Sequence, residues 1–587
     1  MDRPNTDPEN NLGYFNRQAA ADHGTRTAVI DLSRPAPFHL THADLNDRMN
    51  RIAAALKARG MSRGDRLLLA TGNRFEFIEV FFGAMRAGIV PIPLNHKLGA
   101  DTIRFVISDA DARAAVISPE CHPEIEALVD EAGLSPKIST GTHTPGWEAY
   151  ENVLAAADAA QVASPGIGAR ETAFLPYTSG STGVPKGVLL PHDGMLWAIR
   201  AAQHYWPLEA DDRALIAGPL FHKNAMRVSV KPMLRVGASV VILPLFEPKM
   251  FLNALAEYDC THSGGVPAMY RMALAEKDLL ATLAFPRLKC LEMGSAVVGA
   301  DLIAAVETAF DTPVIEAYGL TEGGGPLREP PENDPETSHG PVPRGSCGII
   351  APEVEVKMID TAGTENPSEG ELWVRSPAVL TGYNNRPELT AERIVDGYLR
   401  TGDIFRCDED GHFFFMGRTD DQFSCGGENI NPKEVELLLV QHPDVVDAVV
   451  APIPHDIKGL APAALITVRT TPAPDEDAVK QFTLDHGPAY AHPRRVFVVD
   501  QMPFNGAGKI DRALAKAEML SRIVASDSAA LELGRVRIRP GPPTSTRISR
   551  NVGKYRSPAK KVPHSGSICL LSGGERTLGK CVHRVRR

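Results

Sequence analysis

The 587-residue chain has few cysteines, few aromatic residues and no long hydrophobic run. Its eight cysteines are scattered, and no two of them form the CxxC pair that is typical of zinc ribbons and thioredoxin-like sites. We therefore expect reduced, mostly structural thiols in a cytoplasmic protein. No segment approaches the roughly 20 uninterrupted apolar residues of a membrane-spanning helix. The first thirty residues lack the basic-then-apolar pattern of a secretory leader, so we expect neither secretion nor integral membrane contact.

The charge is distributed unevenly along the chain. The net charge of −10 includes a C-terminal stretch from Gly534 onward with 14 basic residues and one acid, Glu575. The preceding 533 residues therefore carry −23, which argues against nucleic acid as a partner of the main fold. The basic stretch is rich in Gly, Pro and Ser and shows no periodicity, so we expect it to be disordered and without a catalytic role.

The length predicts more than one domain. Short apolar strands alternate with amphipathic helices up to Gly417, for example Arg66–Ala70 before Phe75–Ala87. This alternation predicts an α/β fold with mostly parallel sheets. A second unit begins near Arg418, and its first helix, Pro432–Gln441, has Asn431 as N-cap. We predict a large N-terminal domain of layered α/β sheets at 1–417, a smaller mobile α+β domain at 418–520 and a basic tail at 521–587.

The segment Thr178–Gly187 has the composition of a phosphate-binding loop. It follows an apolar stretch, Thr172–Tyr177, that predicts a buried strand, and it combines three glycines and four hydroxyl side chains with Lys186. Glycines let backbone amides approach a ligand closely, and lysine supplies a point charge for phosphate. Because Lys186 is followed by Gly187, the segment is not a Walker A loop. A flexible linker is the ordinary alternative, but the strand-like continuation behind Gly187 argues against it.

Five further segments place polar residues and glycines at predicted element ends. They are Pro219–His222, Glu316–Glu322, Tyr398–Asp403, Gly417–Asn429 and Pro503–Lys509. We expect Pro219–His222 to open a helix and Tyr398–Asp403 to form a loop. Pro503–Lys509 places one lysine on a glycine-rich loop.

Together, and in this order and spacing, the six segments resemble the core motifs of the adenylate-forming superfamily. This superfamily includes acyl- and aryl-CoA synthetases, peptide-synthetase adenylation domains and luciferases. The resemblance extends to about Arg512 and implies an acid–thiol ligase that uses ATP, Mg²⁺ and coenzyme A. A small carboxylic acid would be converted to an acyl-adenylate with release of pyrophosphate. The acyl group would then pass to the CoA thiol with release of AMP; a homodimer is compatible with the family.

The resemblance also assigns roles to individual residues in the adenylation step. Lys509 would bridge the substrate carboxylate and the α-phosphate, Thr321 would contact that phosphate, and Glu322 would bind Mg²⁺. Tyr318, followed by Gly319, would stack on adenine, Asp403 would contact the ribose, and Arg418 would reach the ribose or a phosphate. Taken singly these are ordinary core or surface residues, and the motif context favours the functional interpretation. The residues implied for the β- and γ-phosphates are Thr178, Ser179, Gly180, Ser181, Thr182, Gly183 and Lys186.

Thioester formation is assigned to the smaller domain. The resemblance implies that this domain rotates about a hinge at Asp420 after adenylation. Gly426, Gly427 and Glu428 would then line a narrow passage for pantetheine, since glycine lets a thin chain pass close to the backbone. His222 would lie where the acyl pocket meets the thiol.

The acyl pocket is expected to begin after His222, at Lys223 and Asn224. A buried, unpaired ammonium is costly, so an inward-pointing Lys223 would require a polar or dicarboxylic acid. A Lys223 that extends toward solvent or toward CoA phosphates would carry no such requirement. The sequence does not decide between these two orientations of Lys223. Aromatic, fatty and polar acids all remain candidate substrates. The opposite wall is expected at Gly294, Ser295 and Ala296.

Two other functions compete with the CoA ligase. An acyl-AMP ligase would hand its acyl group to a carrier protein, but relatives of that kind often carry an insertion that we do not find between Gly382 and Asp420. A non-catalytic nucleotide-binding homologue would be expected to lose Lys509, Glu322 or Asp403, and all three are present.

Overall fold

The computed structural model describes residues 10–118, 123–141, 145–158, 165–178, 184–205, 208–294, 298, 300–329, 342–425, 428–455, 459–470, 472–489, 491–505 and 509–535. The chain divides into two units, Met1–Ala525 and Ser526–Arg587. The sheets and the candidate site described below belong to the first unit. The predicted disorder of the basic stretch beyond Arg535 lies outside the described residues.

A seven-stranded sheet forms the centre of the N-terminal domain. All its neighbouring strands are parallel except the antiparallel edge pair β1–β2. Strand β12 reads Ser-Val-Val-Ile and is buried along its whole length, as expected for a parallel strand covered on both faces. The strands in spatial order are β15 (Val314–Ala317), β14 (Cys290–Gly294), β13 (His262–Gly265), β11 (Arg213–Ile216), β12 (Ser239–Ile242), β1 (Thr27–Asp31) and β2 (Phe38–Thr41).

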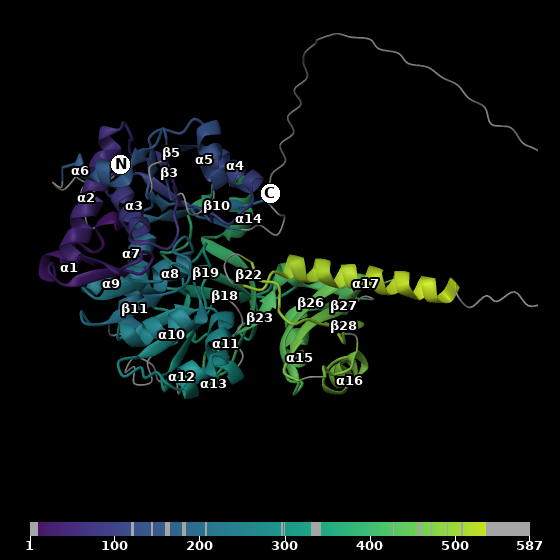
Figure 1. Ribbon diagram of the computed structural model, residues 1–587. Coiled ribbons are helices and arrows are strands. Elements are labelled where there is room, and N and C mark those ends of the chain that lie inside the picture. The colour runs from purple at the N-terminus through teal and green to yellow at the C-terminus, as the bar shows by residue number, and fades with distance from the viewer. Residues whose placement is uncertain are drawn as a thin grey trace, which may run out of the picture. The chain divides into compact units, whose positions relative to one another are not determined.

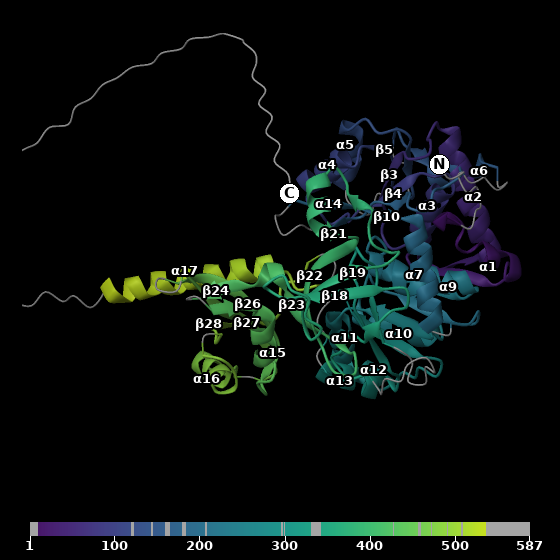
Figure 2. The same ribbon diagram turned by 180° about the vertical axis from the view of Figure 1, so that it is seen from behind.

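Helices cover both faces of this sheet. On one face, Leu215, Val241 and Leu291 share a core with α10 (Pro248–Glu257), α11 (Pro267–Ala275) and α13 (Ala300–Phe310). On the other face, Ala214 and Val240 pack with α7 (His192–Tyr205) and α9 (Lys231–Val236). Figure 1 shows β11 between α9 and α10, and Figure 2 shows α9 and α10 from behind.

A second, fully parallel sheet has the order β4-β3-β5-β6-β7. Every residue of α3 (Phe75–Arg86) is buried, and its phenylalanines share one core with residues of both sheets. A helix this rich in apolar residues is expected where it is covered on all sides, and its buried Glu76, Glu79 and Arg86 are paired with other polar groups. The remaining elements of this layer are β3 (Arg66–Ala70), β4 (Val90–Pro93), β5 (Ala112–Ile117), β6 (Lys137–Ser139), β7 (Glu148–Ala149), α2 (His42–Ala58), α4 (Ala100–Asp109), α5 (Pro123–Glu131) and α6 (Tyr150–Ala155).

The strand predicted over Thr172–Tyr177 is interrupted. The structure divides it into β8 (Thr172–Phe174) and β9 (Tyr177–Thr178), both antiparallel to β10 (Lys186–Pro191). Pro176 lies at the break, and proline has no N–H to donate to the ladder. The hairpin β9–β10 therefore enters the predicted phosphate loop from two paired strands.

The prediction of a loop at Tyr398–Asp403 is wrong, because this segment belongs to strand β22 (Tyr398–Cys407). The strand pairs with β19 (Glu369–Arg375), and its register shifts between Glu371 and Trp373. Gly402 lies in that irregular stretch with a φ of +74°, a conformation that glycine adopts readily. The Thr-Gly-Asp sequence therefore marks a bulge within a strand. This sheet also contains β18 (Glu355–Ile359), β21 (Ile394–Val395) and β23 (Phe413–Arg418).

The C-terminal domain is smaller and mixed. Strands β26 (Val445–His455), β27 (Gly459–Val468) and β28 (Arg495–Val498) form its sheet, and α15 (Pro432–Leu439) and α16 (Glu476–His486) pack in its core. The large N-terminal sheet domain and smaller C-terminal domain confirm the predicted fold class. Helix α17 (Arg512–Arg535) runs through the predicted domain end at Leu520.

The described cysteines are free, and four of the five are buried. Of the helices in the described ranges, none has the length and apolar character needed to cross a membrane.

We predict that Asn431→Ala lowers the free energy of unfolding by about 1–2 kcal/mol, as expected for loss of an N-cap. The Asn431 side chain accepts a hydrogen bond from Lys433 N at 3.1 Å and donates one to the Met416 carbonyl at 2.7 Å. Urea denaturation would measure the change. Asp475, the N-cap residue of α16, makes no side-chain cap bond, so Asp475→Ala is the control and should cost less than about 0.5 kcal/mol. Equal effects of the two substitutions would contradict the capping account.

Candidate active site

The candidate site begins at the carboxyl ends of neighbouring parallel strands. The segments after β11, β13 and β15 emerge at the same edge of the seven-stranded sheet. Ligands of open α/β sheets bind at this edge. The segment after β11 carries His222, and the segment after β15 carries Tyr318, Thr321 and Glu322.

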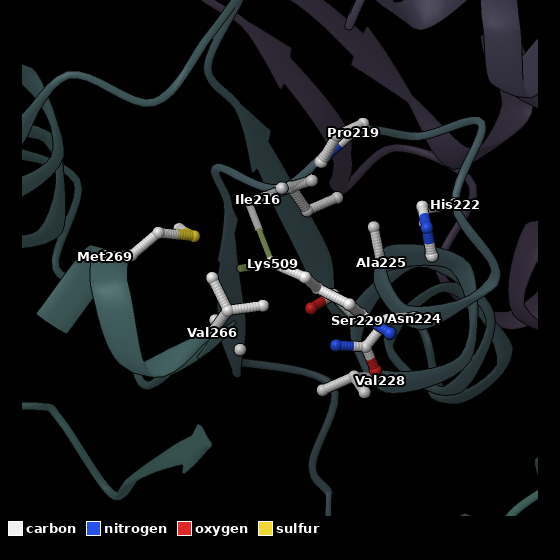
Figure 3. A pocket seen from close by; sticks show the side chains of 13 residues that line it. Ile216, Pro219, His222, Asn224, Ala225, Val228, Ser229, Val266, Met269 and Lys509 are labelled. Atoms are coloured by element: carbon white, nitrogen blue, oxygen red, sulfur yellow. The ribbon is translucent and has the colours of Figure 1, made fainter. Parts of the chain in front are cut away.

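A cavity opens between the segments after β11 and β13 (Figure 3). The space between its walls amounts to about 510 Å³, which includes open solvent. Lys509, nearly three hundred residues downstream of His222, enters the same cavity. The lining residues are Ile216, Gly218, Pro219, His222, Asn224, Ala225, Val228, Ser229, Gly264, Gly265, Val266, Met269 and Lys509.

The backbone of Lys509 is held by two hydrogen bonds to Asn505. The Asn505 backbone N–H donates to the Lys509 carbonyl at 2.7 Å, and the Asn505 side chain accepts from Lys509 N at 3.1 Å. Burial lowers the pKa of the Lys509 ammonium, while Asp403 acts in the opposite direction. The result is a desolvated cation in the lining of the cavity, where an anionic group would be stabilised.

His222 caps the short helix α8 (Lys223–Ala225), and its backbone N–H donates to the Pro219 carbonyl at 3.0 Å. The prediction that this segment opens a helix is confirmed. Burial, with a further contribution from Lys509, lowers the pKa of the His222 imidazole to about 4. The ring is therefore neutral at neutral pH.

Three residues expected at the nucleotide come together. The Tyr318 hydroxyl donates to Asp403 Oδ2 at 2.6 Å, and the Tyr318 ring packs edge-on against Phe405 with centroids 4.8 Å apart. Arg418 Nη1 lies 3.6 Å from Asp403 Oδ1. Burial raises the pKa of the Asp403 carboxyl, and Arg418 and the Tyr318 hydroxyl oppose this rise. The Asp403 carboxylate is thus held in place by groups on two separate elements.

Thr321 and Glu322 lie on a turn closed at its base. Leu320 and Gly324 exchange backbone hydrogen bonds of 2.9 and 3.1 Å. The Tyr383 hydroxyl approaches Glu322 Oε1 at 3.4 Å, and no other side chain in the described part of the chain donates to this carboxylate. Carboxylate oxygens are the ligands that Mg²⁺ prefers, so the donor set fits that ion.

Lys223 takes neither of the two predicted orientations. Its ammonium donates to the Thr321 carbonyl at 2.7 Å and lies 3.4 Å from the Leu320 carbonyl. Burial, together with Lys231 and Arg227, lowers the pKa of Lys223 to about 7. Lys223 is not among the residues that line the cavity, whereas Asn224 is. Lys223 therefore contacts the turn that carries Thr321, and its assignment to the acyl pocket is not supported by this geometry.

The two ends of the predicted phosphate loop are joined by antiparallel strand pairing. Thr178 in β9 pairs with Lys186 in β10. Ser179, Gly180, Ser181, Thr182 and Gly183 lie outside the described residues.

Some of the other predicted site residues lie in the described part of the chain and some do not. Ser295, Ala296, Gly426 and Gly427 lie outside the described residues, and of Glu428 the backbone alone is described, in β25 (Glu428–Ile430). Asp420 is exposed in the short helix η4 (Thr419–Asp421).

Two glycines of the predicted site are required by close backbone packing. A Cβ on Gly294 would lie 2.5 Å from the Ala317 carbonyl oxygen in the neighbouring strand, and one on Gly319 would lie 2.9 Å from that of Gly324. Gly294 thus allows β14 and β15 to approach each other, and it does not line the cavity.

Two features of the site were missed at the level of sequence. Ser229 lines the cavity from a π-helical turn, η3 (Met226–Val230), which has no sequence motif. Arg271 in α11 forms an ion pair with Asp447 in β26, with its Nη1 at 2.5 and 2.6 Å from the two carboxylate oxygens. Single charges that meet across distant elements leave no signal in a single sequence.

Comparison with known proteins identifies two matching family models. The model of the AMP-binding enzyme matches residues 15–384. That of the AMP-binding enzyme C-terminal domain matches residues 434–509.

Individual relatives match along most of the chain. A feruloyl-CoA synthase from Amycolatopsis sp is 32% identical over 473 residues, covering 80% of this chain and 92% of the relative. An oxalate–CoA ligase from Arabidopsis thaliana is 29% identical over 500 residues, covering 84% and 96%. The crystal structure of ATP-bound MatB from Rhodopseudomonas palustris superposes with a TM-score of 0.77 at 27% identity, covering 87% of this chain and 98% of that one.

We predict that His222 titrates near pH 4, well below the ordinary histidine value of 6.5. NMR titration of the imidazole C–H signals, with His222→Asn to assign the resonance, would measure this pKa. Because the Lys509 charge lowers the pKa of His222, Lys509→Ala should raise it. A titration near the ordinary value in the unmodified protein would contradict the buried position of the ring.

Proposed function

This chain belongs to the AMP-binding enzyme family, and we propose that it joins a carboxylic acid to the thiol of coenzyme A at the expense of ATP. In the first step the carboxylate attacks the α-phosphate, forming an acyl-adenylate and releasing pyrophosphate. In the second step the thiol attacks the acyl carbon and AMP leaves.

The position of Lys509 is the observation that carries the proposal. Its side chain lines the cavity and interacts electrostatically with Asp403, which belongs to the candidate nucleotide site. Two anions, a carboxylate and a phosphate, must approach each other in the first step. A preorganised, desolvated cation lowers the cost of bringing them together and of the charge that develops there.

The nucleotide contacts are proposed from the same geometry. Asp403, held by Tyr318 and Arg418, would accept hydrogen bonds from the ribose hydroxyls, and Tyr318 would stack on adenine. The β9–β10 hairpin, with Thr178 and Lys186 at its ends, would hold the β- and γ-phosphates. The turn that carries Thr321 would present its hydroxyl to the α-phosphate, and Lys223 would hold this turn through the Thr321 carbonyl.

Glu322 would hold Mg²⁺ through its carboxylate. A bound Mg²⁺ supplies charge neutralisation for the phosphates.

The second step is assigned to a rotation of residues 418–520 about Asp420. Rotation would withdraw Lys509 and bring Gly426, Gly427 and Glu428 to the site as the pantetheine passage. His222, neutral at physiological pH, would lie beside the incoming thiol without adding charge. The Arg271–Asp447 ion pair joins elements on either side of the proposed hinge and so must break during such a rotation.

The proposal is tested by measuring pyrophosphate and AMP release over a panel of carboxylic acids, with and without CoA. Turnover to AMP that requires CoA and yields a thioester supports the ligase. Accumulation of acyl-adenylate that CoA does not discharge would favour transfer to a carrier protein instead. The acid itself is not decided by the relatives, since a feruloyl-CoA synthase and an oxalate–CoA ligase both match the chain.

We predict that Lys509→Ala lowers the rate of adenylate formation at least a hundredfold but leaves thioester formation from supplied acyl-adenylate within threefold of wild type. The reason is that the lysine acts on charge in the first step alone, and about 2.7 kcal/mol of stabilisation corresponds to a hundredfold in rate. Lys249→Ala is the matched control, since Lys249 is largely exposed in an ion pair with Glu276. An equal loss of both half-reactions would contradict the two-conformation account.

A second prediction concerns the Arg271–Asp447 pair. Asp447→Asn should slow adenylate formation about three- to tenfold, because it removes an interaction present in the arrangement that places Lys509 in the cavity. The charge-reversed pair Arg271→Asp/Asp447→Arg should recover part of the rate. Rates of the two half-reactions, measured separately, would test this. A decrease of both rates by the same factor would indicate a structural role unrelated to the domain arrangement.

A further inference from the structure

The carboxylate of Asp109, the last residue of α4, joins segments that lie far apart in the chain. Its side chain is 8% exposed, and Oδ2 accepts hydrogen bonds from the Tyr177 hydroxyl at 2.7 Å and from Asn384 Nδ2 at 3.2 Å. The Asp109 carbonyl accepts from Asn384 Nδ2 at 2.7 Å and from Asn385 Nδ2 at 2.9 Å. Arg386 Nη1 lies 3.6 Å from Oδ1. One residue of α4 therefore holds groups that are 68 and 275 positions away in sequence.

Figures 1 and 2 both show α4 beside α14 (Pro387–Arg393), the helix that follows these asparagines. The hydrogen bonds of Asp109 join these two parts of the chain.

Two of the groups bound to Asp109 belong to the base of the predicted phosphate loop. Tyr177 precedes Thr178 in β9 and pairs with Gly187 in β10. The Asn384 backbone N–H donates to the Gly187 carbonyl at 2.8 Å. A Cβ on Gly187 would lie 3.0 Å from Tyr177 Cζ and 3.0 Å from Asn384 Cβ, so the three residues pack closely. The Asp109 carboxylate thus holds β9 through Tyr177 and β10 through Asn384.

The asparagine segment also reaches the candidate metal ligand. Tyr383 precedes Asn384 at the end of β20 (Gly382–Tyr383) and pairs with Val188 of β10. Its hydroxyl approaches Glu322 Oε1 at 3.4 Å. A shift of this segment would therefore move β10 and the contact to Glu322 together.

A carboxylate suits this position because its neighbours are hydrogen-bond donors. Burial, and after it the hydrogen bond to Asp109, raises the pKa of the Tyr177 hydroxyl, which therefore stays protonated and donates. Hydrogen bonds to an ionised acceptor are about twice as strong as those between neutral groups. Without the carboxylate the Tyr177 hydroxyl would lose its acceptor, and a buried donor that lacks a partner is costly.

Loss of the Asp109 side chain would not open an apolar void. Asp109 lines a second, polar cavity together with Arg66, Asp111 and Arg113, and this cavity is open to solvent. Water can therefore fill the space that a shorter side chain leaves. What a truncation removes is chiefly the set of hydrogen bonds to Tyr177 and Asn384.

We infer that Asp109 is a positioning residue for adenylate formation, which keeps β9 and β10 in the spacing that places Thr178 and Lys186 at the β- and γ-phosphates. It acts through Tyr177 and Asn384 and not on the nucleotide itself. A misplacement of about 1 Å can cost a hundredfold in rate even when the change lies far from the chemistry, so this spacing matters. The inference rests on the proposed CoA-ligase function and adds to it a residue outside the six ordered segments.

Nucleotide affinity tests this inference without knowledge of the acid. Isothermal titration calorimetry of the full chain with ATP and Mg²⁺, and separately with AMP, gives a Kd for each nucleotide. Asp109→Ala should weaken ATP binding at least fivefold and AMP binding less than twofold, because AMP lacks the β- and γ-phosphates. Tyr177→Phe removes one hydroxyl and keeps the ring, so it gives the same test with less effect on folding, and it should weaken ATP binding at least threefold. The double variant should bind ATP within twofold of Asp109→Ala, because both substitutions remove the same hydrogen bond.

The two half-reactions give a second readout. Asp109→Ala should lower kcat/KM for ATP in adenylate formation at least tenfold. Thioester formation from supplied acyl-adenylate should stay within twofold of wild type, since pyrophosphate has left before that step. Asp109→Asn keeps an acceptor oxygen and should lose less activity than Asp109→Ala.

Asp101→Ala is the matched control. Asp101 lies in the first turn of the same helix, exposed in an ion pair with Arg104 at 2.9 Å, so neither Kd should change. ATP binding that is unchanged in Asp109→Ala and Tyr177→Phe, or ATP and AMP binding weakened equally, would overturn the inference and leave the ligase function standing. Absence of CoA-dependent AMP release for every acid would instead count against the ligase function, while an ATP-specific loss of affinity would still support the role of Asp109.

Discussion

The parallel order of the seven-stranded sheet is the constraint on which the site depends. Parallel neighbours end at the same edge, so the segments after β11, β13 and β15 meet although up to about a hundred residues separate them in sequence. This edge supplies the cavity wall from β11 and β13 and the turn with Thr321 and Glu322 from β15. At Gly294 the strands β14 and β15 approach so closely that a Cβ would lie 2.5 Å from the Ala317 carbonyl oxygen.

The positively charged side chains near the site impose a second constraint, because each of them has a different partner or position. Lys223 is bound to a backbone carbonyl, Arg227 is paired with Glu292, and Lys509 enters the cavity from the C-terminal domain. A desolvated lysine acts strongly on an anion and is itself costly to bury. In the proposed two-step reaction, a lysine on a separate domain would be present in the site during the first step and withdrawn for the second.

The alternation of strands and helices up to Gly417 predicted the layered α/β domain correctly, since burial on both faces of a parallel strand leaves a continuous apolar run. The Asn431 cap and the helix after it were equally readable, because capping is local. The prediction at Tyr398–Asp403 was wrong for a physical reason. Thr-Gly-Asp is compatible with a turn and with a bulge, and pairing with β19 and β23, which no local pattern specifies, selected the bulge.

The sequence by itself determined the family, the larger and smaller domains and the residue types available for chemistry, because ordered motifs and hydrophobic periodicity are properties of the chain. The tertiary structure decided which of these side chains face one another. It directed Lys223 to the Thr321 carbonyl, placed Asn224 and Ser229 on one wall and paired Arg271 with Asp447. Such side-chain directions depend on packing between elements far apart in sequence and on a π turn of one helix, and neither is encoded in local pattern.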